Sequence, residues 1–170
     1  IWSKLNDIIL FKHKIYIMTI DKFEFYHGAV LTKLINFGEK LSIQTFPSES
    51  NATFTINGNI GIYVKYSAKR MTPWVFTFKK IHQVELKAIS ELHKETFLVM
   101  VCGSDGITCV NYKRLKKLLD DNFDLAEWVK AHRYRREQYQ LSGSDGELNY
   151  KIPKKNFPEE ILSAVKKHSI

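Results

Sequence analysis

A continuous apolar segment, FLVMVC at residues 97–102, is the feature that most restricts how this chain can fold. A strand with one face in water alternates apolar and polar side chains, whereas an unbroken apolar run is typical of a strand covered on both faces. We therefore expect residues 97–102 to form an interior strand of a sheet with further layers on each side. The turn sequence Gly-Ser-Asp-Gly follows at residues 103–106, and residues 107–110 are expected to return as the next strand.

Asn57-Gly58 is the strongest short hairpin signal in the sequence, because both residue types adopt the positive φ that a type I′ turn requires. It predicts that strands at residues 53–56 and 60–66 pair with each other. Residues 41–46 alternate like an earlier strand, and residues 74–78 (WVFTF) have the β-branched and aromatic side chains of a later one.

Four segments show the apolar spacing of helices, namely residues 21–37, 80–94, 112–119 and 159–167. In the first of them, Asp21 and Glu24 have capping-box spacing, and Gly38 marks the expected end. Residues 124–137 fit both a helix and a strand. We favour a strand, because the glycine-containing sequence of residues 139–152 resembles a hairpin that continues from it.

These elements predict an α+β (or α/β) fold in which a single, mostly antiparallel mixed sheet is flanked by helices. The expected order is αβββαββ, followed by a C-terminal hairpin and a helix. The chain has 170 residues, of which 44% are hydrophobic and 26% are charged, and this composition fits one domain. We assign residues 21–170 to that domain and residues 1–20 to an N-terminal extension, in which Met18 is either the natural start or an internal residue.

No stretch of the sequence reaches the roughly 18–20 apolar residues that a membrane span requires, and no secretory signal is evident. We therefore expect a cytoplasmic protein with no membrane partner. Cys102 and Cys109 are expected to be buried, reduced thiols, because two cysteines without a histidine pair do not complete a zinc site. The sequence lacks glycine-rich phosphate loops and the common hydrolase motifs, so it gives no support to nucleotidyl transfer, hydride transfer or zinc hydrolysis.

The chain carries 26 Lys and Arg against 18 Asp and Glu, a net charge of +8, and basic residues gather in two acid-free stretches. These stretches are residues 50–84 and residues 128–136. Clustered basic side chains with aromatic residues between them are typical of contact with nucleic-acid phosphates and bases. The residues expected to make such contacts are Lys65, Ser67, Lys69, Arg70, Trp74, Lys130, His132, Arg133, Arg135 and Arg136.

The order helix, three strands, helix, strand over residues 21–112 resembles the core of the restriction-endonuclease-like, or PD-(D/E)XK, nucleases. In that family, acids on two successive strands bind Mg²⁺, and a lysine helps to position or activate the attacking water. The resemblance places Lys65 at the family's lysine, with Glu49 as the nearest upstream acid and Glu24 as a helical one. Tyr63 stands where a strand acid belongs, so the resemblance implies a degraded metal site in a relative that binds nucleic acid without cleaving it.

Three functions are compatible with these features. The first is a nucleic-acid-binding domain for DNA or RNA, a nuclease-like protein of a mobile or defence element that needs no cofactor. The second is a protein-interaction or structural module whose basic face meets an acidic protein partner. The third is an active metal-dependent nuclease that uses Lys65 with Glu24 or Glu49 and takes Mg²⁺ as its cofactor. The sequence indicates neither other metal ligands nor an oligomeric state.

Overall fold

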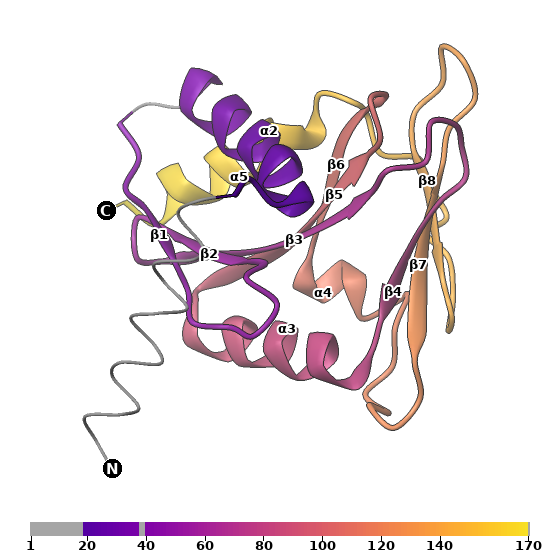
Figure 1. Cartoon of the computed structure of the whole chain (residues 1–170), viewed down its shortest axis with the longest axis horizontal. Helices are drawn as coiled ribbons and strands as arrows, with labels where there is room; N and C mark the ends of the chain where they lie inside the picture. The colour runs from indigo at the N-terminus through magenta and orange to yellow at the C-terminus, as the bar shows by residue number, and fades with distance from the viewer. Residues whose placement is uncertain (1–18, 38–39, 170) are drawn as a thin grey trace.

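The computed structural model describes residues 19–37 and 40–169. Within these residues the chain forms four helices and eight strands, which Figure 1 shows arranged as layers. In chain order they are α2 (Lys22–Phe37), β1 (Ile43–Thr45), β2 (Thr53–Ile56), β3 (Ile60–Ser67), β4 (Trp74–Phe78), α3 (Lys80–Leu92), β5 (Glu95–Cys102), β6 (Gly106–Asn111), α4 (Tyr112–Leu115), β7 (Glu127–His132), β8 (Gln140–Gly143) and α5 (Asn156–Lys167).

Five strands form the main sheet, in the order β1-β2-β3-β5-β6. β5 lies between β3, to which it is parallel, and β6, to which it is antiparallel. Leu98 and Met100 pack in the core on the side of α3 and α4, whereas Phe97 and Val99 pack on the side of α2 and α5. These side chains are buried, which confirms the prediction of an interior strand that is covered on both faces.

The remaining three strands form a second sheet, in the order β4-β7-β8, with both pairs antiparallel. Its inner side chains, including Phe76 and Val129, share one core cluster with Leu86 of α3 and Leu98 of β5. The structure confirms an α+β fold with a mixed, mostly antiparallel main sheet flanked by helices. The strands divide between two sheets rather than one, because β4 pairs with β7 instead of extending the main sheet. From α2 to β6 the observed order matches the expected order αβββαββ, except that β4 is an additional strand before α3.

The turn predicted at Asn57-Gly58 joins β2 to β3, with φ values of 49° and 71° at the two residues. This confirms the hairpin. The Gly-Ser-Asp-Gly sequence of residues 103–106 recurs at residues 143–146. Gly103 has a φ of 54°, which favours glycine, and a Cβ atom there would also overlap the Lys69 carbonyl. Gly143 lies so close to the Leu118 carbonyl that a Cβ atom would overlap it.

The ambiguous segment at residues 124–137 contains β7, so the strand interpretation is confirmed. The first helix begins at Lys22, and the Asp21 amide donates to Glu24 Oε2 at 2.6 Å, which is half of the expected capping box. The helix end predicted at Gly38 lies outside the described residues, as does most of the N-terminal extension. Among the helices that the structure describes, none is long and apolar enough to cross a membrane.

The two cysteines are free and buried, as expected. Cys102, on β5, packs in the core with α3 and α4, whereas Cys109, on β6, packs in the core with α2 and α5. Because the two thiols lie on opposite faces of the main sheet, they do not form a redox pair with each other.

His27 makes folding stability depend on pH. It lies on α2, is 6% exposed, and packs against Phe23 and the edge of Phe54. Burial lowers the pKa of His27 to about 4. Between pH 6.5 and pH 4, the unfolded chain therefore binds a proton that the folded chain excludes, and the free energy of unfolding falls by about 2–3 kcal/mol as the pH is lowered.

We expect urea titrations at pH 7 and pH 5 to show this loss of stability, and the variant His27→Phe to show a smaller loss. A phenylalanine ring keeps the aromatic contacts and carries no titratable group. An equal loss of stability in His27→Phe and in the unaltered chain would show that His27 is not the group responsible.

Candidate functional site

The two acid-free basic stretches, far apart in the sequence, meet in the structure. Antiparallel pairing of β4 with β7 sets Trp74 opposite Ala131. The β3–β4 loop (residues 68–73) and the β7–β8 loop (residues 133–139) thus leave the paired strands at the same end. The Arg133 amide donates to Thr72 Oγ1 at 3.0 Å, and Figure 1 shows the two loops side by side.

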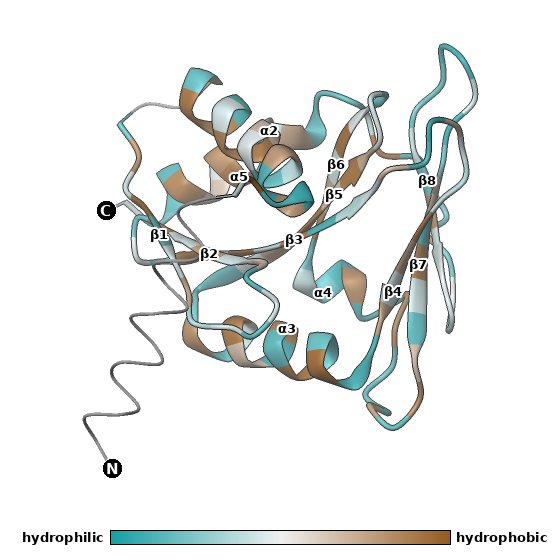
Figure 2. Ribbon diagram, viewed as in Figure 1, coloured by the Kyte–Doolittle hydropathy of each residue, from teal (hydrophilic) through white to brown (hydrophobic). Residues whose placement is uncertain are grey.

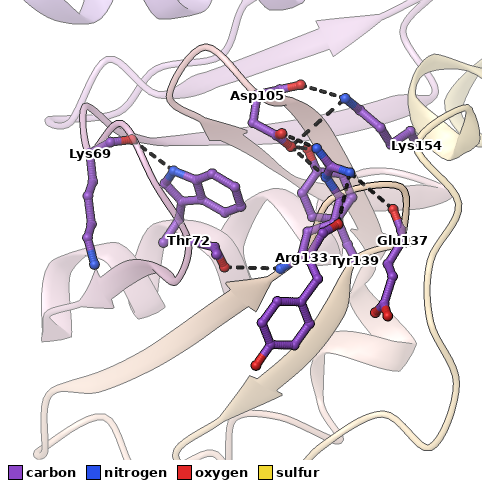
Figure 3. A network of polar contacts seen from close by, with 9 residues as sticks. Lys69, Thr72, Asp105, Arg133, Glu137, Tyr139 and Lys154 are labelled. Atoms are coloured by element: carbon purple, nitrogen blue, oxygen red, sulfur yellow. Dashed lines mark hydrogen bonds and ion pairs between the residues drawn. The ribbon is translucent and has the colours of Figure 1, made fainter.

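Asp105 holds this junction together from the β5–β6 turn of the main sheet (Figure 3). The Arg133 guanidinium donates to both oxygens of Asp105, and its Nε lies 2.8 Å from Oδ2. Tyr139 donates its hydroxyl to Asp105 Oδ2 at 2.6 Å, and Lys154 donates to the Asp105 carbonyl at 2.7 Å. Arg133 also donates to the Glu137 carbonyl at 3.2 Å, across the β7–β8 loop.

Asp105 and Arg133 each stabilise the charged form of the other. The hydrogen bonds from Arg133 outweigh the effect of burial and lower the pKa of Asp105 below its usual range. Burial, together with the bond to Asp105, raises the pKa of Tyr139. Arg133 is a fixed cation with a side chain that is only 13% exposed. The prediction that Arg133 is an exposed phosphate-binding residue is therefore wrong, because its guanidinium is occupied in joining the two sheets.

Four exposed cations lie in the same two loops. Lys69, Arg70, Arg135 and Arg136 are exposed, and none of them forms an ion pair with an acid within the residues that the structure describes. Lys69 Nζ donates only to the Pro73 carbonyl, at 3.2 Å. We call residues 68–73 and 133–138 the basic loop pair; Figure 2 shows it as largely hydrophilic, in contrast to β5 and β6.

The outer face of the second sheet adjoins the basic loop pair. Inward and outward residues alternate along β4 and β7, so the outward positions of the sheet face solvent. These outward residues are Val75 and Thr77 on β4, Trp128, Lys130 and His132 on β7, and Gln140 and Ser142 on β8. None of them is acidic. We call them the outer face.

Two aromatic rings are accessible at this surface. Trp128 is 37% exposed, and Lys130 Nζ lies 5.3 Å from the centre of its ring. Tyr134 is 63% exposed, and its ring lies 4.4 Å from the half-buried ring of His132. Trp128 was not among the predicted contact residues. The alternation of residues 127–132 is the signal that could have revealed it, since this pattern puts Trp128 on the same face as Lys130 and His132.

Trp74 is not available for stacking on a base, which corrects its place among the predicted contacts. It is 2% exposed in the core between the sheets, and its indole Nε1 donates to the Lys69 carbonyl at 2.8 Å. Its role is to hold the β3–β4 loop against the core. Ser67, at the end of β3, is half-buried, and its Oγ accepts from the Lys69 amide at 3.4 Å.

Lys65 lies apart from the basic loop pair, in a partly buried polar cluster between β3 and α3. Its Nζ donates to the Thr77 carbonyl at 2.9 Å and lies 2.8 Å from His82 Nδ1. Burial lowers the pKa of Lys65 to about 8. Burial, followed by the charge of Lys65, also lowers the pKa of His82. The Lys65 ammonium is therefore partly buried and bonded to groups of β4 and α3, apart from the basic loop pair.

Glu85 lies one turn along α3 from His82, and its negative charge acts to raise the pKa of Lys65. Glu85 is 8% exposed and accepts hydrogen bonds from the Tyr63 hydroxyl at 2.9 Å and from the Ser50 hydroxyl at 2.5 Å. The Ser50 amide donates to its other oxygen at 3.0 Å. Burial acts to raise the pKa of Glu85, but these hydrogen bonds outweigh it, and the net shift is downward.

The predicted acids do not assemble around Lys65. Glu24 lies on α2, on the opposite face of the main sheet from Tyr63 and α3. The Glu49 side chain is exposed, and its backbone, rather than its carboxylate, contributes to lowering the pKa of Glu85. The sequence reasoning missed His82 and Glu85, although their i, i+3 spacing puts them on one face of a helix. The carboxylate of this cluster is Glu85, and both of its oxygens accept hydrogen bonds. We therefore interpret the cluster as a structural polar contact between β3 and α3.

No protein-family model, no curated protein and no solved structure matches this chain. The resemblance to the restriction-endonuclease-like core therefore stays a prediction, and the function has to be inferred from the chain's own geometry.

Proposed function

We propose that this protein binds single-stranded nucleic acid across the outer face and the basic loop pair. One observation carries the proposal: the pairing of β4 with β7 brings both acid-free stretches to one surface, where two aromatic rings are exposed. The proposal also includes two expectations from the sequence, a cytoplasmic location and a role in a mobile or defence element.

The chemistry of the surface matches that of an unpaired strand. Lys69, Arg70, Arg135 and Arg136 are exposed cations without acidic partners in the part of the chain that the structure describes, and cations of this kind neutralise phosphates and release counterions. Trp128 and Tyr134 expose ring faces on which unpaired bases can stack, and such stacking contributes about 1–3 kcal/mol per base. In a duplex the base faces are covered by their neighbours, so exposed rings beside cations favour single strands.

Two acids at the loops are already paired, Asp105 with Arg133 and Glu137 with Lys151, so they repel a polyanion less than free carboxylates would. An acidic protein partner would meet the same cations, so binding of a labelled oligonucleotide has to be measured directly.

We expect fluorescence anisotropy with a labelled oligothymidine to give an affinity that falls steeply with salt. Replacing Lys69, Arg70, Arg135 and Arg136 with Gln should flatten the log–log salt slope by about 3, since each lost phosphate contact removes about 0.7 from a single-strand slope. Arg133 is left in place, because it holds the fold. Trp128→Ala should weaken binding about 5- to 100-fold with the salt slope unchanged, because it removes stacking rather than charge.

The matched control removes four exposed lysines that lie elsewhere, Lys22, Lys33, Lys94 and Lys113. Its net charge equals that of the loop variant, so an effect of total charge alone would change both slopes equally. Equal slopes in the two variants, or no binding at low salt, would contradict the proposal and favour a module that binds an acidic protein.

A further inference from the structure

Three carboxylates that lie apart in the sequence converge behind the second sheet. Asp120 follows α4, Glu127 begins β7, and Asp145 lies in the turn after β8; each offers an oxygen within 4.8 Å of the others. The Asp120 amide donates to Glu127 Oε1 and to Asp145 Oδ2, each at 3.0 Å. The Asp145 amide donates to the Leu118 carbonyl at 3.1 Å. Backbone contacts thus hold the acids together.

Glu127 is the buried member of this group. It occupies an inward position on β7 and is 4% exposed. Its Oε2 is buried and accepts no hydrogen bond from any residue that the structure describes. A buried carboxylate oxygen without a donor or cation is costly, typically by several kcal/mol. Either a proton shared with the neighbouring Asp145 carboxylate or a bound cation would stabilise this oxygen.

A second oxygen without a donor lies beside it. Gln83 of α3 is 4% exposed, and its Nε2 donates to the Phe78 and Leu125 carbonyls at 3.2 and 2.9 Å. This arrangement assigns Oε1 as the acceptor, and Oε1 is buried without a partner among the described residues. Gln83, Asp120 and Glu127 line the same cavity of about 10 Å³ together with Lys116 and mostly apolar side chains, and Asp145 lies outside this lining. A cavity of this size holds one water-sized occupant.

The protein's own cations do not neutralise this group. Within residues 19–37 and 40–169, no Lys, Arg or His forms an ion pair with the side chains of Asp120, Glu127 or Asp145. Lys116 pairs instead with Asp121 and donates to the Asp120 carbonyl. The charge of these three acids is therefore offset either by a proton shared between Glu127 and Asp145 or by an external cation, and cation titration distinguishes the two.

We propose that Asp120, Glu127 and Asp145 bind one divalent cation of the Ca²⁺ or Mg²⁺ class, with Gln83 Oε1 as a further oxygen ligand. An all-oxygen set rich in carboxylates suits these hard cations and not Zn²⁺ or Cu²⁺. Ca²⁺ is the better match, because at about 2.3–2.6 Å from each ligand it can bridge oxygens nearly 5 Å apart. The cation ties the turn after β8 to β7 and to the chain that follows α4. This site is separate from the proposed nucleic-acid surface.

Isothermal titration calorimetry of the EDTA-treated full chain with CaCl₂, and separately with MgCl₂, at pH 7.5 tests the site. We expect one Ca²⁺ per chain and a rise in Tm on adding Ca²⁺, with Mg²⁺ binding more weakly. Asp145→Asn should weaken Ca²⁺ binding by more than about tenfold, because it removes a charged ligand.

The matched control is Asp124→Asn, because Asp124 lies in the same loop region and pairs with Lys80 outside the cluster. It should bind Ca²⁺ as the unaltered chain does. The Tm of each variant without added cation shows that it is folded. The proposal is overturned if neither cation gives heat or a change in Tm, or if Asp145→Asn and Asp124→Asn bind Ca²⁺ equally well.

Discussion

Replacing Asp105 with Ala should lower the free energy of unfolding by about 3–5 kcal/mol. The substitution removes both carboxylate oxygens to which Arg133 donates and leaves this cation, whose side chain is 13% exposed, with the Tyr134 and Glu137 carbonyls but no acidic partner. It also removes the acceptor of the Tyr139 hydroxyl, on a residue that is wholly buried. Because Asp105 belongs to the main sheet and both donors belong to the second sheet, the loss should loosen the contact between the sheets.

Urea denaturation at pH 7 measures this effect. Tyr139→Phe should cost about 1.5–3 kcal/mol, since it removes one hydrogen bond to a charged group. Asp124→Ala serves as the control: its ion pair with Lys80 is exposed, so it should leave the free energy of unfolding almost unchanged. If Asp105→Ala were as stable as Asp124→Ala, Asp105 would not be the link between the sheets.

Replacing Glu85 with Ala should lower the free energy of unfolding by about 2–4 kcal/mol. Tyr63 is wholly buried and would lose the acceptor of its hydroxyl, while Ser50 would lose the acceptors of its amide and its hydroxyl. Lys65 would lose the carboxylate that supports its charge. The cost is moderated because the Ser50 and Tyr63 hydroxyls, 3.2 Å apart, can still bond to each other.

Glu91 is the matched control on the same helix. Its pair with Lys87 is exposed and 4.0 Å long, so Glu91→Ala should change stability by less than about 0.5 kcal/mol. Glu85 stabilises the fold at any pH above the pKa that its carboxyl has in the unfolded chain. This stabilisation is lost as the pH falls through the lower pKa that the carboxyl has in the folded chain. A Glu85→Ala variant as stable as Glu91→Ala would show that the cluster around Lys65 contributes little to the fold.

The elements predicted correctly are those whose signal is local. The composition of residues 97–102 is enough to predict an interior strand, and the two residues Asn57-Gly58 are enough to predict a turn. The strand at residues 127–132 was favoured over a helix because a hairpin-like sequence follows it at residues 139–152. In each case the property that decides the structure lies in the segment itself or close to it along the chain.

The features that the sequence did not reveal depend on pairing across the fold. Arg133 looked like a free cation because Asp105 lies 28 positions away, in a turn. Trp74 looked like a stacking residue, although the packing of the two sheets buries it. From the sequence, Asp145 is expected to be a turn residue, but the fold places its carboxylate beside those of Asp120 and Glu127. Hydrophobic periodicity carries no information about such partners.

Chemical-shift mapping by NMR of the isotope-labelled chain, titrated with oligothymidine at low salt, tests the proposed nucleic-acid surface most directly. We predict that the perturbed amides cluster in residues 68–73 and 128–136, and that the Trp128 indole signal shifts while the buried Trp74 indole signal changes little. Perturbations centred on α2 and α5, on the other side of the main sheet, or no perturbation at any ratio, would contradict the assignment of this surface to nucleic-acid binding.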